Sequence, residues 1–75
     1  MEREKDRTKF VELAEKRVTK AIKDIRLIGN LSNKSNYIYT DDDARKIIRA
    51  LEAEIKRLKQ RFNSHGVQDE VVFKL

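Results

Sequence analysis

The sequence predicts an all-α protein, an antiparallel helix-loop-helix hairpin that forms one domain over residues 1–75, and three observations predict it. First, the chain has no proline and only two glycines. Second, charged residues (41%) slightly outnumber hydrophobic ones (39%), which is typical of solvent-exposed helices. Third, two stretches repeat apolar residues at steps of three and four, the spacing that lines one side of a helix.

The first helix is expected over residues 3–28. Its apolar residues form one stripe with coiled-coil spacing, made of Val11, Ala14, Val18, Ala21, Ile25 and Ile28 and widened by Phe10 and Ile22. Gly29 and Asn30 follow, and both residue types readily adopt the positive φ that ends many helices. We therefore expect the first helix to stop at this pair.

The second helix is expected over residues 41–63, with a stripe of Ala44, Ile47, Ile48, Leu51, Ile55, Leu58 and Phe62. Thr40 is a good N-cap because its hydroxyl can accept from the amide of Asp43. Asp41, Asp42 and Asp43 place negative charge where the helix dipole is positive. Near the other end the helix dipole is negative, and positive charge is placed there by Lys56, Arg57, Lys59 and Arg61. The stretch Asn63 to Gly66 is expected to end the helix.

Charge favours an antiparallel arrangement of the two helices. It brings the early acids Glu2, Glu4 and Asp6 toward Lys59 and Arg61, although each exposed pair is worth only ~0.2–1 kcal/mol. A chain this short buries little core of its own, and it has no cysteine with which to form a disulfide. We therefore expect a homodimeric four-helix bundle, or a hairpin that completes its core by docking on another protein.

The connection over residues 29–40 is longer than a tight helical hairpin needs. It combines side chains suited to a protein interface, and we predict a partner-binding loop made of Asn30, Leu31, Asn33, Asn36, Tyr37 and Tyr39. For Tyr39 the alternative is a local contact with Ala44 in the first helical turn. The tail, residues 64–75, is expected to be a partly ordered end with an apolar anchor, or else a segment that covers the helix pair or adds a strand to a partner.

No arrangement of residues predicts catalysis. The three consecutive aspartates are explained by helix capping, since consecutive residues at a helix start point in different directions and do not alternate ligands around a cation. Ser64 and His65 are adjacent but lack a third, orienting group, and the two glycines stand alone rather than in a phosphate-binding loop. We therefore expect that the protein is not an enzyme and that it binds no cofactor, metal ion or small-molecule substrate.

The net charge of +5 allows contact with a nucleic acid. Lys9, Lys16, Lys20 and Lys23 lie largely opposite the first apolar stripe, and the candidate contacts are Lys16, Lys20, Lys23, Arg45, Arg49 and Arg57. The competing interpretation is a solvated surface stabilised by acid-to-base pairs four residues apart: Glu12–Lys16, Asp41–Arg45, Asp42–Lys46 and Glu52–Lys56. No apolar run reaches the ~20 residues that span a bilayer, and no secretory signal begins the chain, so we expect a cytoplasmic protein.

The stretch Ile25-Arg26-Leu27-Ile28-Gly29-Asn30-Leu31-Ser32-Asn33, followed by Tyr37-x-Tyr39-Thr40 and by a helix that closes at Arg61-Phe62, resembles a group of small uncharacterised bacterial helical proteins. The likeness covers about residues 10–62. It implies a bacterial or mobile-element origin and carries no activity. The sequence thus predicts a non-enzymatic protein-interaction module, an adaptor, regulator or inhibitor of a larger bacterial protein. The alternative is a DNA- or RNA-binding accessory protein.

Overall fold

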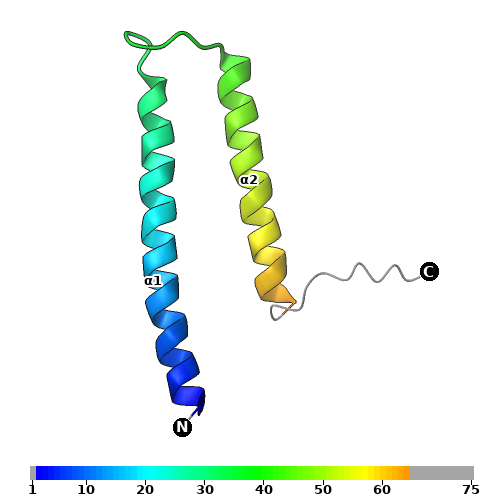
Figure 1. Ribbon diagram of the computed structural model, residues 1–75. Helices are drawn as coiled ribbons and strands as arrows, with labels where there is room; N and C mark the ends of the chain where they lie inside the picture. The colour runs from blue at the N-terminus through cyan, green and yellow to red at the C-terminus, as the bar shows by residue number, and fades with distance from the viewer. Residues whose placement is uncertain (1, 65–75) are drawn as a thin grey trace, which may run out of the picture. The chain divides into compact units, whose positions relative to one another are not determined.

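The computed structural model describes residues 2–64, and every regular element in that range is helical. Helix α1 spans Glu2–Gly29, a short 3-10 helix η1 spans Asn30–Ser32, and helix α2 spans Asp41–Asn63 (Figure 1). For the described residues the all-α prediction is confirmed. The predicted bounds match those of α2 and differ by one residue at each end of α1.

The chain divides into two compact units, one from Met1 to Ile38 and the other from Tyr39 to Leu75. The first contains α1, η1 and the turn that follows, and the second contains α2. The hairpin and the single domain therefore stay predictions. The predicted roles of His65, of Gly66 and of the tail beyond Ser64 lie outside the described residues.

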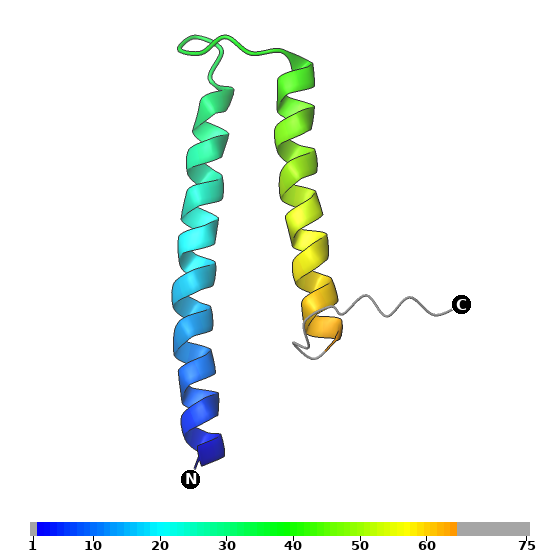
Figure 2. The same ribbon diagram turned by 45° about the vertical axis from the view of Figure 1, so that its right-hand side comes forward.

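Helix α1 runs without interruption through its 28 residues (Figure 2). On its surface the Lys20 ammonium lies 2.7 Å from the Asp24 carboxylate, one turn along the helix. Near its start the guanidinium carbon of Arg7 lies 5.7 Å from the centre of the Phe10 ring, a cation–π distance. Both contacts join residues three or four apart, the neighbours on a helix surface.

The end of α1 corrects the prediction made for Gly29 and Asn30. Gly29 has φ −58° and ψ −31°, an ordinary right-handed helical conformation, and Asn30 begins η1. The helix therefore ends by tightening into a 3-10 turn rather than by reversing at a positive φ. A Cβ placed on Gly29 would meet nothing within 4 Å, so neither backbone nor packing requires glycine here.

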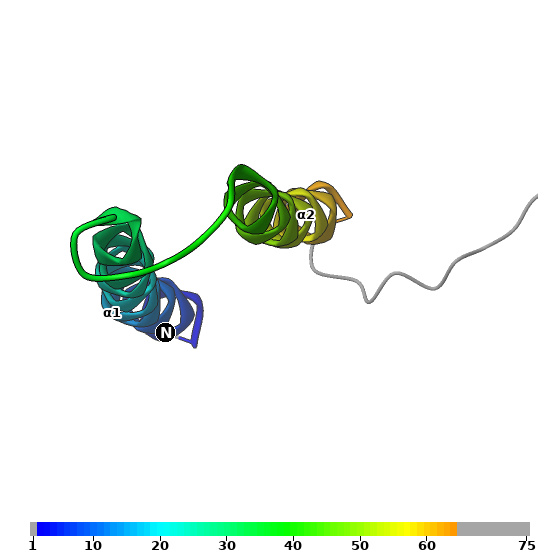
Figure 3. The same cartoon turned by 90° about the horizontal axis from the view of Figure 1, so that it is seen from above.

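The chain turns after η1 and before α2 (Figure 3), and Asn33 organises this turn. The backbone carbonyl of Asn33 accepts from the amides of Asn36 and Tyr37, each at 3.0 Å. Its side-chain Oδ1 accepts from the amide of Ser35, also at 3.0 Å. Asn33 thus satisfies three backbone donors that have no helical ladder to join, which is the usual role of asparagine in turns.

Helix α2 begins as predicted, with one addition. The Thr40 hydroxyl accepts from the Asp43 amide at 3.0 Å, and the Asp43 carboxylate accepts from the Thr40 amide at 2.9 Å. The two bonds form a reciprocal capping box, in which a shorter aspartate replaces the usual glutamate. Tyr39 and Ala44, the residues of the predicted local contact, are both partly shielded from solvent.

Helix α2 also ends with local hydrogen bonds. The Ser64 amide donates to the carbonyl of Gln60 at 2.9 Å, and the Ser64 hydroxyl donates to the carbonyl of Arg61 at 3.1 Å. Two of the last carbonyls of the helix, which lack partners inside it, are satisfied in this way. Asn63 is the last helical residue, in agreement with the predicted bound.

The described residues contain no buried side chain, polar or apolar. This follows from the architecture of each unit, because a single helix has no second surface against which to bury its stripe. The apolar residues predicted to line one side of each helix are therefore not buried within residues 2–64.

Candidate interaction surfaces

Helix α2 carries an apolar surface along one side, the α2 stripe, which we define as Ala44, Ile47, Ile48, Leu51, Ile55, Leu58 and Phe62. Five of its six large side chains are exposed, with Ile55 at 58% and Phe62 at 62%, and Leu51 is partly shielded. At 3.6 residues per turn the seven positions fall within ~100° of the helix circumference. The stripe is therefore wide enough to contact more than one neighbouring helix.

The first unit carries the α1 stripe, which we define as Phe10, Val11, Ala14, Val18, Ala21, Ile22, Ile25 and Ile28. It differs from the α2 stripe in its central line, where alanines alternate with β-branched residues. Val18 is 55% exposed and Ile25 46%. Small residues at regular spacing let a second helix approach closely, so this stripe suits a partner with larger side chains.

The predicted partner-binding loop is divided between the two units. Asn30, Leu31, Asn33, Asn36 and Tyr37 belong to the first unit, whereas Tyr39 belongs to the second. Asn33 is engaged in the turn. Leu31 and Tyr37 are about half exposed, as an interface side chain of a free protein should be.

Ile38 is the residue that the predicted loop set left out. It is fully exposed, at 105% of its reference area, and it lies next to the boundary between the units. An isoleucine between two tyrosines in a polar loop was the sequence signal that could have identified it. Leu31, Tyr37 and Ile38 are the apolar surface of the loop in the first unit.

The six predicted nucleic-acid contacts differ in their surroundings. Lys20 is paired with Asp24, and Arg57 with Glu54 three residues earlier. Within residues 2–64 no ion-pair partner accompanies the other four, which are Lys16, Lys23, Arg45 and Arg49.

The expected acid-to-base pairs form only in part. Asp42 and Lys46 lie 3.3 Å apart, as expected. In the described part of the chain, the three other pairs lie beyond ion-pair distance, namely Glu12–Lys16, Asp41–Arg45 and Glu52–Lys56. Exposed pairs of this kind gain only tenths of a kcal/mol, so the side chains are weakly held in any one arrangement.

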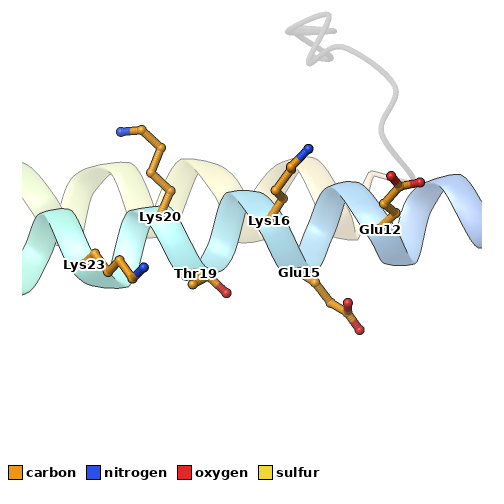
Figure 4. A pocket seen from close by; sticks show the side chains of 6 residues that line it. All are labelled: Glu12, Glu15, Lys16, Thr19, Lys20 and Lys23. Atoms are coloured by element: carbon orange, nitrogen blue, oxygen red, sulfur yellow. The ribbon is translucent and has the colours of Figure 1, made fainter.

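The lysines of α1 gather on one side of the helix. We define the lysine face as Lys5, Lys9, Lys16, Lys20 and Lys23, which fall within ~60° of the circumference, opposite the α1 stripe. Figure 4 shows part of it, with Glu12, Lys16 and Lys20 in one row and Glu15, Thr19 and Lys23 in the next. These six line a shallow, open depression on a single helix, which does not enclose a ligand. Sequence reasoning missed Lys5, although it shares the same spacing.

The described residues hold no group of three or more acidic, histidine or cysteine side chains arranged to bind a metal ion. Two of the three aspartates at the start of α2 are engaged locally, Asp43 in the capping box and Asp42 with Lys46. Neither of the two long helices in the described part is apolar enough over its length to cross a membrane.

The chain matches no protein-family model, and no curated protein or solved structure matches it. The resemblance to small bacterial helical proteins therefore stays a prediction.

Proposed function

We propose that the chain is a non-enzymatic protein-interaction module whose two helices pair as an antiparallel hairpin and then associate with a second copy or dock on a larger protein. One observation carries the proposal: within residues 2–64 each helix exposes an apolar stripe along one side, and a single helix has no second surface with which to cover it. Stripes of this size are rare on proteins that act alone. Association with a second molecule buries such a surface away from water.

The stripes are complementary in size when they run in opposite directions. With Val18 opposite Leu51, each alanine of the α1 stripe meets an isoleucine of the α2 stripe, and the layers are Val11–Leu58, Ala14–Ile55, Val18–Leu51, Ala21–Ile48 and Ile25–Ala44. Large residues opposite small ones fill the space between helices without voids. This regular alternation supports the antiparallel pairing.

The hairpin alone leaves apolar side chains at the edges of the seam. Phe10 and Ile22 flank the α1 line, and Ile47 flanks the α2 line; all three are at least 40% exposed. Four-helix bundles cover such flanking positions by adding two further helices. We therefore favour a homodimer, and docking on a larger protein is the alternative.

Sedimentation velocity at micromolar concentration tests the association. We expect a dimer that unfolds cooperatively, or a poorly packed monomer if the natural partner is a different protein. A well-folded monomer with cooperative unfolding would contradict the proposal, because its stripes would then need no second molecule.

The loop is proposed to supply the specific contacts with a protein partner, through Tyr37, Leu31 and Ile38. Exposed tyrosines bury a large area at a small cost in side-chain entropy, which favours Tyr37 as the anchor. Affinity capture from the native host with wild-type protein and with Tyr37→Ala tests this role. Recovery of the same proteins at the same yield from both would exclude the loop as the contact surface.

A further inference from the structure

The five residues of the lysine face lie on one side of α1, apart from its arginines. From Lys5 to Lys23 the row extends for about 27 Å at 1.5 Å per residue. No arginine of α1 falls within the same arc of the helix. Among the acidic residues, Glu12 lies at the edge of the arc, one turn before Lys16.

Most of the row is available for an external anion. All five lysines are exposed. Lys20 is paired with Asp24, and its side chain is still 77% exposed, so the pair is weakly held. In the part of the chain that the structure describes, Lys5, Lys9, Lys16 and Lys23 have no ion-pair partner. Four of the five lysines therefore carry an ammonium group that no ion pair within the described residues holds.

We propose that the lysine face of α1 binds the phosphate backbone of double-stranded DNA. A duplex carries one negative charge per ~1.7 Å of its axis, and a straight row of lysines releases counterions when it lies along that backbone. Lysine contacts phosphate as a compact point charge, whereas arginine is the residue suited to bidentate contact with bases. Binding is accordingly independent of base sequence.

An anionic membrane is the competing partner, because helices that lie on membranes also insert an apolar side and carry lysines on the opposite, polar side. The lysine face and the α1 stripe have this arrangement. The choice of DNA therefore rests on the proposed function, in which the α1 stripe packs against another helix and is not free to insert into lipid. A DNA duplex is compatible with that packing, because it contacts the lysine face and leaves the stripe to the second helix.

Fluorescence anisotropy of the full chain with a labelled duplex of about 30 base pairs, over a range of salt concentrations, tests the proposal. The variant is K9Q/K16Q/K23Q, and the matched control K46Q/K56Q/K59Q removes the same charge from α2. We expect the first variant to bind on the order of 100-fold more weakly at 0.15 M salt and the slope of log K against log salt to fall by about 2.7, at about 0.9 per lost phosphate contact. The control should lose less than about tenfold, and a second duplex of unrelated sequence should bind equally well.

Several outcomes would overturn the proposal: no binding of wild type at 50 mM salt, equal losses in the two variants, a strong preference for one duplex, or binding to phosphatidylserine vesicles in place of DNA. Circular dichroism and sedimentation of all three proteins should agree, since none of these lysines belongs to a stripe. Sedimentation of the wild-type chain reports on helix association separately from DNA binding, so a failure of the proposed function can be told apart from a failure of the DNA proposal.

Discussion

The two helices share the same apolar spacing but differ in how their ends and faces are built. Helix α2 begins with a reciprocal capping box, ends with two hydrogen bonds from Ser64, and carries a stripe of mostly large side chains. Helix α1 runs into a 3-10 turn, has alanines along its stripe, and gathers its lysines on the opposite side. The comparison indicates that local interactions determine both ends of α2, whereas the end of α1 has no side-chain cap and its alanines leave room for the larger side chains of a second helix.

The largest expected effect comes from a charge placed in the α2 stripe. In Leu51→Glu the carboxylate would have to leave water when the stripes pack, so we expect a loss of about 3 kcal/mol or more in the free energy of unfolding. Urea denaturation and sedimentation velocity measure the loss and the accompanying dissociation. The matched control is Ala53→Glu, on the opposite side of α2, which should change stability by less than about 0.5 kcal/mol. Equal effects of the two substitutions would show that the stripe is not a packing surface.

A smaller effect is expected at the start of α2. Thr40→Ala removes the hydroxyl that accepts from the Asp43 amide, and the typical cost of losing such a cap is about 1 kcal/mol. Thr40→Ser keeps the acceptor and should remain close to wild type. Urea denaturation followed by circular dichroism compares the three proteins. If the alanine variant were as stable as the serine variant, the capping box would contribute nothing to folding.

The smallest expected effect is at Gly29, where the sign of the change in stability distinguishes between the two possible conformations at the end of α1. Gly29 is in the right-handed helical region with open space around its Cα, so Gly29→Ala should stabilise the chain by about 0.5–1 kcal/mol. A glycine with positive φ at the same position would give the opposite result, because alanine is strained there. A lower unfolding midpoint for the alanine variant would therefore support the conformation that the sequence predicted and contradict the structure.

Sequence reasoning was most accurate where the determining interactions are local. The bounds of α2 depend on Thr40, Asp43 and the residues after Phe62, all of which act within four positions along the chain. At Gly29 the same reasoning was wrong, because glycine permits a positive φ without requiring it. Composition and spacing alone do not decide between the two conformations.

The surfaces were predicted less completely than the helices. The spacing of apolar residues identified both stripes, and charge identified most of the lysine face. Neither pattern identified which acidic and basic side chains would pair. Glu54 pairs with Arg57 three residues away, whereas the expected pair of Glu52 and Lys56 does not form within the described residues. Exposed pairs are too weak for spacing to select among neighbours. The relative placement of the helices depends on contacts between distant residues, which no local pattern specifies.

The antiparallel pairing of the stripes is the central claim, and pulsed electron spin resonance tests it most directly. The chain has no cysteine, so spin labels can be placed at chosen sites without background. Two double variants, Lys23→Cys/Lys46→Cys and Lys9→Cys/Gln60→Cys, put labels on the outer sides of both helices near their two ends, diluted with unlabelled chain to suppress distances between copies. Because paired helices keep a nearly constant separation of about 8–10 Å between axes, we expect similar, narrow distance distributions for both variants. A distance for the second variant that is much longer or broad would contradict the account, since the helices would then diverge instead of meeting along their stripes.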